Sequence, residues 1–369
     1  MGLADLSGID FPWDTLAGLK ARAAKHPGGL IDLSMGTPVD PTPELVREAL
    51  VAAADAPGYP LTAGTPALRA AIAEWFARRR RVPGLELDQV LPTVGSKELV
   101  GLLPSLLGAG PGDVVVHPRI AYPTYAAGAA AAGATALATD DVDEWAGRDD
   151  VRLVWVNSPA NPHGRVLGVE ELRGVVAAAR EIGAVVVSDE CYAELGWGQW
   201  GPDDAGAGVP SILDPRVCDN SHDGLLAAYS LSKQSNLAGY RAAFVAGDGR
   251  LIGDLLQRRK HLGLIVPAPV QAAMVAALSD DAHVAAQRRL YAARRRALTE
   301  ALARAGLAVD HSEAGLYLWV RSDPEWFADR GILGAPGALY GPAGAGHVRI
   351  ALTATDERIA DAVFRLTNS

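Results

Sequence analysis

Cysteine is scarce in this sequence, where Cys191 and Cys218 are the only two. Two cysteines exclude a disulfide framework and a cysteine-rich zinc site, and we expect no bound metal. Such scarcity is typical of a reducing compartment. The N-terminus also lacks the basic stretch followed by an apolar stretch that marks a secretory signal. We therefore expect a cytoplasmic protein.

Positive charge is also in short supply, because 34 lysines and arginines face 43 aspartates and glutamates, for a net charge of −9. The absence of a basic excess argues against a nucleic-acid partner. No uncharged apolar run reaches the length of a membrane span, so we expect no membrane partner. Two short arginine clusters, at 78–81 and 294–296, lie in helical patterns and are expected to form solvated faces.

Lysine itself is rare, which narrows the search for a reactive amine. The chain contains five lysines, namely Lys20, Lys25, Lys97, Lys233 and Lys260. Lys233 differs from the others because it ends the run Tyr229-Ser230-Leu231-Ser232-Lys233, directly after an apolar, strand-like stretch. Desolvation and nearby cations favour the neutral form of a lysine, which is the form that acts as a nucleophile.

What the sequence has in abundance is an alternation of short apolar segments with helical patterns. The expected strands are 90–94, 114–117, 152–156, 184–188, 225–229 and 242–246. This alternation predicts an α/β fold with a mostly parallel sheet covered by helices on both faces. At 369 residues the chain exceeds the usual size of one domain.

The two ends of the chain follow different patterns. Residues 1 to about 40 are expected to form an irregular arm. After Lys260 the sequence changes to long helical patterns and two separate strand-like segments, 316–320 and 348–352. This second pattern predicts a smaller α+β domain at the C-terminal end.

Polar residues follow four of the expected strands at their carboxyl ends. Gly95, Asn161, Asp189 and Lys233 each come directly or within a few residues after a strand. Ligands of open α/β sheets bind at the carboxyl ends of the strands. Four separate strand ends therefore indicate one shared cleft.

Two residues of this set, with a tyrosine close by, suit the chemistry of pyridoxal phosphate. Lys233 is the expected Schiff-base lysine and proton shuttle, and Asp189 the expected partner of the pyridinium nitrogen. Tyr192, three positions after Asp189, is expected to reach the phenolic oxygen of the cofactor. The alternatives are a surface lysine, a helix N-cap aspartate and a core tyrosine.

The phosphate of this cofactor has its own expected partners. Gly95, Ser96 and Lys97 open a helix after a strand, where free N–H groups and the positive end of the helix dipole attract a phosphate. Ser230 belongs to the lysine's own run, and Arg241, eight positions after that lysine, offers a bidentate fork. Lys97 is a rival for the cofactor lysine by position, but no Asp-x-x-Tyr pattern precedes it.

Two further residues, Tyr122 and Asn161, are expected to border both cofactor and substrate, and Arg349 is expected to bind the substrate. Tyr122 would stack on the pyridine face, with a core aromatic as the alternative. Asn161, in a proline-flanked turn, would donate to the ring oxygen of the cofactor. Arg349 alternates on a strand with Val348 and Ile350, and a buried arginine there would bind a substrate carboxylate. An exposed arginine on the strand face is the alternative.

Together these residues resemble the fold-type I pyridoxal-phosphate enzymes, specifically the class I and II aminotransferases. The similarity covers nearly the whole chain, and the spacings from Asp189 to Tyr192 and from Lys233 to Arg241 fit the family. The resemblance implies pyridoxal 5'-phosphate as the cofactor and amino transfer as the reaction.

The same resemblance implies how the chain is divided and assembled. An arm over residues 1–40 would pack with a small C-terminal domain over 267–369, and residues 41–266 would form a large cofactor-binding domain with a mostly parallel, seven-stranded type of sheet. The family implies a homodimer with shared active sites, in which Tyr59 reaches the cofactor phosphate of the partner. Gly36 would lie beside the substrate carboxylate.

A closer resemblance is to the actinobacterial succinyldiaminopimelate aminotransferases. Strings such as Phe11-Pro12-Trp13-Asp14 and Ser312-Glu313-Ala314-Gly315-Leu316-Tyr317-Leu318-Trp319 carry it. It implies amino transfer from glutamate, which becomes 2-oxoglutarate, to N-succinyl-2-amino-6-oxopimelate in lysine and diaminopimelate biosynthesis. Arg119 is a speculative partner of the distal carboxylates. His163 departs from the family's usual threonine, and we expect an exposed turn residue there rather than a hydrogen-bonding imidazole.

Other functions stay open at this point. The same fold serves other substrates, such as aspartate or an aromatic acid, and it also serves carbon–sulfur β-lyases, which eliminate a thiol. A ligand sensor in a transcription regulator would need a DNA-binding module before the catalytic fold. The first 40 residues are neither basic nor similar to a helix-turn-helix.

Overall fold

The computed structural model describes residues 15–201 and 208–368. The string Phe11-Pro12-Trp13-Asp14 lies outside these residues. The described chain builds a seven-stranded sheet, a four-stranded sheet and a two-stranded sheet. Within this described part, no helix is both long enough and apolar enough to cross a membrane.

The large sheet has the predicted, mostly parallel architecture. Its strands in spatial order are β2 (Val90–Val94), β8 (Ala242–Gly247), β7 (Leu225–Ser230), β6 (Val185–Asp189), β5 (Val151–Asn157), β3 (Val114–His117) and β4 (Thr135–Ala138). β8 runs antiparallel to both of its neighbours, and the other pairs are parallel. β4 was not expected, because it is a mostly exposed edge strand of small residues without an apolar run.

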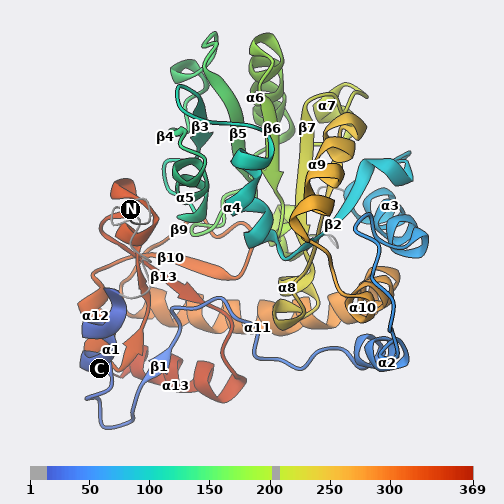
Figure 1. Ribbon diagram of the computed structural model, residues 1–369. Helices are drawn as coiled ribbons and strands as arrows, with labels where there is room; N and C mark the ends of the chain where they lie inside the picture. Colours follow the sequence, from blue (N-terminus) through green and yellow to red (C-terminus); the bar gives the residue numbers. More distant parts are fainter. Residues whose placement is uncertain (1–14, 202–207, 369) are drawn as a thin grey trace, which may run out of the picture.

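Helices cover both faces of this sheet (Figure 1). One face packs against α4 (Ser96–Leu106), α5 (Thr124–Ala131) and α9 (Gly249–Leu262). The other face packs against α3 (Pro66–Arg80), α6 (Val169–Ile182), α7 (Pro215–Cys218) and α10 (Ala268–Ser279). Because both faces are buried, the central strands consist of continuous apolar runs rather than alternating ones.

A smaller unit follows in the chain. Its antiparallel sheet contains β12 (Ala335–Pro336), β13 (His347–Ala351), β10 (Tyr317–Arg321) and β9 (Val309–Asp310). The long helix α11 (Ala282–Arg304) extends from the α10 side of the molecule toward this sheet and packs against α13 (Asp356–Thr367) (Figure 1). A short helix, α12 (Pro324–Asp329), follows β10 in the chain.

The expectation of an irregular arm is wrong for part of the described chain. Residues Ala17–Ala23 form helix α1, which packs against α12, and β1 (Ile31–Asp32) pairs in parallel with β11 (Ile332–Leu333). Both elements are too short for a periodic signal, and they are stabilised by contacts from the far end of the chain. The division at residues 40 and 266 remains our proposal. Helix α10, which begins just after the second boundary, packs against α2 (Glu44–Ala52) and α3 of the preceding part.

The expectation of solvated arginine clusters is also wrong in part. Arg80 is buried and donates to a carboxylate oxygen of Glu190, with an Nη2–Oε2 distance of 3.0 Å. Arg294 is buried as well and binds the two carboxylate oxygens of Asp40, at 2.6 and 2.8 Å. These partners lie far away in the sequence, so a local pattern of charge gives no sign of them.

Candidate active site

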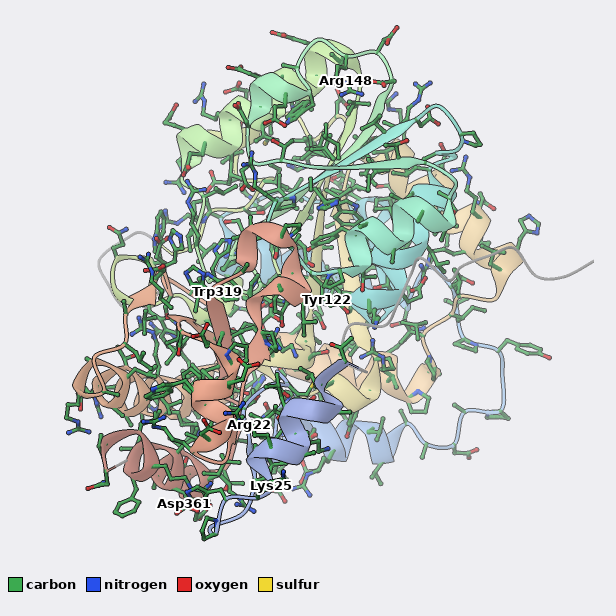
Figure 2. The ribbon with its side chains drawn as sticks, turned by 90° about the vertical axis from the view of Figure 1, so that its left-hand side faces the viewer. Arg22, Lys25, Tyr122, Arg148, Trp319 and Asp361 are labelled. Atoms are coloured by element: carbon green, nitrogen blue, oxygen red, sulfur yellow. The ribbon has the colours of Figure 1, made fainter. Side chains whose placement is uncertain are left out.

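A cleft of about 440 Å³ opens at the carboxyl ends of the parallel strands. Figure 2 shows Tyr122, one of its lining residues, near the middle of the molecule, with Arg148 at one end and Asp361 at the other. The predicted site residues that line the cleft are Gly36, Ser96, Lys97, Tyr122, Asn161, Asp189, Tyr192, Ser230, Lys233, Arg241 and Arg349. The strand-end prediction of one shared cleft is consistent with this arrangement.

Lys233 enters the cleft from a short helix after β7. This helix, α8 (Leu231–Gln234), is capped by Ser230, whose hydroxyl oxygen accepts from the backbone N–H of Ser232 at 3.2 Å. The amine of Lys233 is half-buried and donates to the backbone carbonyl of Gly36. The lysine is therefore inside the cleft rather than on the surface, which excludes the surface alternative.

Asp189 ends β6 and is fixed by two donors. The hydroxyl of Tyr125 donates to its Oδ2 at 2.8 Å, and the backbone N–H of Cys191 donates to its Oδ1 at 3.2 Å. Burial and the Asp189 carboxylate raise the pKa of Tyr125 well above its usual range, so this phenol stays protonated and remains a donor. Sequence reasoning missed Tyr125. Its only signal is its place three positions after Tyr122.

Tyr192 forms a pair with a second tyrosine that sequence reasoning also missed. The hydroxyls of Tyr192 and Tyr317 are 3.1 Å apart. Burial, followed by the neighbouring Tyr317, raises the pKa of Tyr192 well above its usual range. Burial alone would raise the pKa of Tyr317 too, but Arg349 and Lys233 together with the hydrogen bond lower it. Tyr192 is thus the natural donor of the pair.

At the start of α4, a glycine leaves room for the guanidinium of Arg241. Gly95 has a φ of +76°, and a Cβ built there would lie 2.2 Å from a guanidinium nitrogen of Arg241. Glycine alone allows this backbone and this close approach. Ser96 begins the helix beside it, and Arg241 donates to the carbonyl of Ala238 at 2.9 Å. Free helix N–H groups beside an arginine fork fit a phosphate group.

Tyr122 and Lys97 both line the cleft and lie close to each other. The amine of Lys97 lies 6.0 Å from the centre of the Tyr122 ring. That ring meets Tyr125 edge to face, with centroids 6.0 Å apart. Tyr122 is half-buried and lines the cleft, so it is not an ordinary core aromatic.

Arg349 is buried at the opposite wall, which excludes the exposed alternative. It is 2% exposed and donates to the side-chain oxygen of Asn161 at 2.9 Å and to the backbone carbonyl of Ser34. Its guanidinium carbon lies 4.0 Å from the ring centre of Tyr317 and 5.0 Å from that of Tyr340. A guanidinium between aromatic faces is held in one orientation, ready for a planar carboxylate.

Three other residues lie away from the cleft of this chain. Tyr59 is fully exposed. Arg119, half-exposed, has a guanidinium nitrogen 3.5 Å from a carboxylate oxygen of Glu144. The expectation of an exposed turn residue at His163 is wrong, because the ring is half-buried and its Nδ1 accepts from the backbone N–H of Arg165 at 3.2 Å.

Known proteins resemble this chain over almost its whole length. The sequence profile of the family "Aminotransferase class I and II" matches residues 29–366. A 4-dedimethylamino-4-oxo-anhydrotetracycline transaminase, OxyQ, of Streptomyces rimosus is 58% identical over 97% of this chain and 99% of its own. A probable aminotransferase, Rv1178, of Mycobacterium tuberculosis is 56% identical over 97% of this chain and 85% of its own.

Solved structures share the fold. An aminotransferase of Neisseria meningitidis superposes with a TM-score of 0.86 at 29% identity, covering 98% of this chain and 97% of its own. A probable N-succinyldiaminopimelate aminotransferase of Thermus thermophilus gives a TM-score of 0.83 at 28% identity, covering 96% and 99%. The chain belongs to the class I and II aminotransferases, a family of fold-type I enzymes that use pyridoxal 5'-phosphate.

Proposed function

We propose that this enzyme transfers an amino group between an amino acid and a keto acid in the cleft described above. When bound, the cofactor supplies an aldehyde that accepts the amino group and a ring that withdraws electrons from the reacting carbon. The observation that carries the proposal is the presence of Lys233, Asp189 and Arg349 in one cleft. They supply an amine, an anion and a cation from three different elements, α8, β6 and β13.

Lys233 is proposed to hold the cofactor and to move the proton. Its amine already points into the cleft and donates to the carbonyl of Gly36. A positioned amine that takes a proton from a carbon next to the amino group and returns it elsewhere acts as a general base and then as a general acid. The Gly36 carbonyl supports this role, because it keeps the amine on the substrate side of the cleft.

Asp189 and Tyr192 are proposed to set the electronic state of the ring. Asp189, oriented by Tyr125 and by the N–H of Cys191, would pair with a protonated ring nitrogen. Tyr192 would share a proton with the phenolic oxygen of the cofactor, together with Asn161. The raised pKa of Tyr192 supports a donor at this position.

The remaining polar groups divide between phosphate and substrate. We propose that Gly95, Ser96, Lys97, Ser230 and Arg241 surround the phosphate, because they gather where α4 and α8 begin. A phosphate carrying up to two negative charges is well matched by two cations and helix N–H groups.

The substrate's own carboxylate is assigned to Arg349. Gly36 lies on the same side of the cleft, where a Cβ would collide with the hydroxyl of Tyr317 at 1.9 Å. Tyr122 and Asn161 would border the same substrate. The contact of Arg349 with Asn161 links the carboxylate site to the cofactor site.

We propose a homodimer in which Tyr59 completes the site of the partner subunit. Tyr59 is 100% exposed, and Leu61 close to it in the chain is 56% exposed. A fully exposed tyrosine beside an exposed leucine supports an interface here. The two free cysteines, both buried, are consistent with the cytoplasmic location that we propose.

The first substrate pair that we propose is glutamate with N-succinyl-2-amino-6-oxopimelate. Its support is the resemblance to succinyldiaminopimelate aminotransferases and the similar Thermus structure. Arg119 is not proposed for the distal carboxylates, since it pairs with Glu144 outside the cleft.

A second candidate acceptor is a ketone on a polycyclic aromatic compound. The OxyQ relative, named for an oxo-anhydrotetracycline, supports it. Tyr317 offers support of another kind, because its ring lies beside Arg349, where we place the substrate.

Single half-reactions test these proposals. The cofactor-loaded enzyme is mixed separately with glutamate, N-succinyl-LL-diaminopimelate, aspartate, alanine, an amino-anhydrotetracycline and cystathionine, and the visible absorbance of the cofactor is followed. Rapid conversion by glutamate and the succinylated diamine supports the first pair. Conversion by glutamate and the tetracycline amine supports the second. Pyruvate release from cystathionine without conversion by any amine would overturn amino transfer in favour of a β-lyase.

A further inference from the structure

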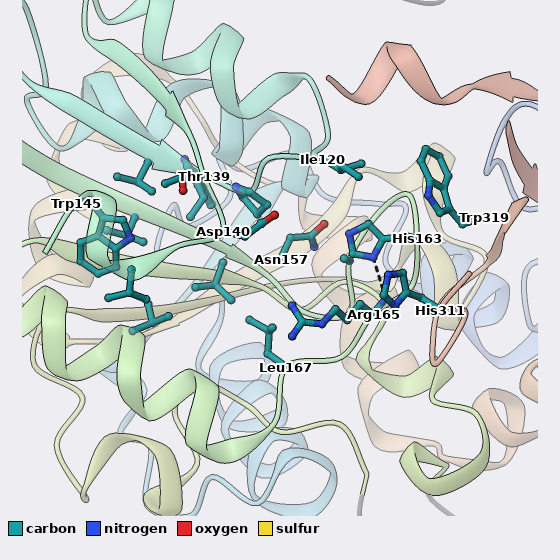
Figure 3. A pocket seen from close by; sticks show the side chains of 18 residues that line it. Ile120, Thr139, Asp140, Trp145, Asn157, His163, Arg165, Leu167, His311 and Trp319 are labelled. Carbon is teal, nitrogen blue, oxygen red and sulfur yellow. Dashed lines mark hydrogen bonds between the residues drawn. The ribbon is translucent and has the colours of Figure 1, made fainter. Parts of the chain in front are cut away.

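A second hollow, of about 310 Å³ (Figure 3), meets the cleft at the 157–164 loop, whose residues Asn157, Ala160 and His163 line it. The two hollows share Asn157 as a lining residue, but Lys233, Asp189, Arg241 and Arg349 line only the cleft. We call the second hollow the Trp145 pocket. Its volume is within the range of pockets that hold small organic ligands.

The walls of the Trp145 pocket are apolar. Val116, Val154 and Val156 line it from the face of the large sheet that carries α6, and Leu167 lines it from the loop before that helix. Trp145 also lines the pocket, but its indole ring is only 2% exposed, so the accessible apolar surface comes from partly buried residues such as Val142, Leu167 and Val175. These surfaces suit the flat, apolar body of an aromatic ring.

Polar groups gather at the end opposite Trp145, where Figure 3 shows His163, His311 and Arg165 together. The imidazole rings of His163 and His311 have centroids 5.2 Å apart. Because Nδ1 of His163 accepts from the backbone N–H of Arg165 at 3.2 Å, the neutral ring carries its proton on Nε2. That nitrogen is then a donor for an acceptor in the pocket.

The electrostatics of this end favour a negative charge. Burial, followed by His311, Arg165 and His347, lowers the pKa of His163 to about 3, so the ring is neutral at neutral pH. Arg165 is a permanent cation in the lining of this end, and an anion beside it would accept a charge-assisted hydrogen bond. The guanidinium of Arg165 pairs with Glu171, whose side chain is 47% exposed, so this partner is easily replaced.

One carboxylate also lines the pocket, at a different place. Asp140 is exposed, and its Oδ1 accepts from the backbone N–H of Arg119 at 3.2 Å. Figure 3 shows it apart from Arg165, on the Ile120 and Thr139 side of the pocket. It therefore restricts where an anion can sit and leaves the histidine end as the favourable one.

We propose that the Trp145 pocket binds a small aromatic carboxylate, with its ring against the pocket's apolar side chains and its carboxylate against His163 and Arg165. The ligand would rest on the loop that presents Asn161 to Arg349 on the cleft side. The same loop is tied to the smaller unit, since the carbonyl of His163 accepts from the N–H of Ser312 at 2.9 Å. Such a site is separate from the amino-transfer cleft and does not depend on its proposed substrates.

Calorimetric titration of the cofactor-loaded protein with indole-3-acetate tests the proposal, and neutral indole-3-acetamide is the matched probe. We expect the acid to bind at least about tenfold more tightly than the amide, because only the acid forms charge-assisted hydrogen bonds. Saturating 2-oxoglutarate in the cleft should leave this binding in place. Equal affinity for the two probes, or no binding at millimolar acid, would overturn the proposal.

Two variants on the surface side of the pocket distinguish it from the cleft. Arg165→Gln should weaken indole-3-acetate about tenfold and leave the amide unchanged, whereas Glu171→Gln should tighten the acid a few-fold by releasing the guanidinium. Both side chains are partly exposed, so folding is preserved and melting curves check it. If Arg349→Lys, in the cleft, abolishes binding while Arg165→Gln does not, the acid is bound in the cleft and the proposal is wrong.

Discussion

The two hollows that meet at the 157–164 loop are lined by different kinds of side chain. The cleft collects charged and hydroxyl groups at strand ends, each oriented by a second residue, as Tyr125 orients Asp189 and Asn161 orients Arg349. The Trp145 pocket is an apolar space with its polar groups at one end. The comparison indicates that a catalytic site needs many side chains held in place by neighbouring residues. A binding site needs only a cavity that fits the ligand and a few polar atoms directed into it.

The strongest test of this difference is removal of the cleft's amine. Lys233→Ala should lower kcat at least about 100-fold, because a positioned acid–base group contributes about 10² to 10⁴ in rate. Borohydride treatment followed by mass spectrometry of peptides should no longer find the cofactor attached. Lys97→Ala is the matched control and should keep the attachment. The reverse result would move the covalent role to Lys97.

The next test concerns the fork that Arg349 presents between two tyrosine rings. Arg349→Lys keeps the charge but loses the planar pair of donors, and we expect kcat/KM for the amino acid to fall about 10- to 100-fold, mostly through KM. Steady-state kinetics with glutamate measure this. Arg119→Lys, on the exposed arginine that pairs with Glu144, should change kcat/KM by less than about twofold. Equal losses in both variants would remove the carboxylate role from Arg349.

The buried pair of Arg80 and Glu190, next to Asp189, gives a third test, which measures stability rather than rate. Arg80→Met leaves Glu190 as a buried charge without its cation, although Ser211 and the N–H of Ile212 still donate to it. We expect a loss of about 3–5 kcal/mol in the free energy of unfolding, measured with urea. Arg78→Met, in a partly exposed pair with Asp281, should cost at most about 1 kcal/mol. Similar losses would contradict the importance of burial.

The smallest effect is expected at the ion pair between Asp40 and Arg294 of α11. Burial alone would raise the pKa of Asp40, but hydrogen bonds from Arg294 and Gln287 hold it below its usual value. Asp40→Asn should cost about 1.5 kcal/mol of unfolding free energy at neutral pH. The pKa of Asp40 is lower in the folded than in the unfolded protein. The stability advantage of the wild type over the variant should therefore be full above about pH 4 and should disappear as the pH falls through the folded-state pKa. An advantage that stays constant down to pH 2 would contradict the ion pair.

Much of the fold and of the cleft follows from local patterns. An apolar run that ends in a polar residue predicted β6 with Asp189 and β7 with Lys233, because a buried parallel strand leaves a clear signal. Tyr125 and Tyr317 were missed for the opposite reason. Each stands in an apolar stretch where a tyrosine resembles core, and its partner is 64 or 125 positions away. Arg80 was assigned to a solvated face because Glu190 is 110 positions away.

The position of β8 between β2 and β7 bears on the order in which the molecule is made. Once residue 247 has been synthesised, every strand of the large sheet exists, together with Gly95, Lys233 and Arg241. Arg349 follows more than a hundred residues later. Because domains tend to fold as units during synthesis, a growing chain is able to complete its cofactor cradle well before it has any means of holding a substrate.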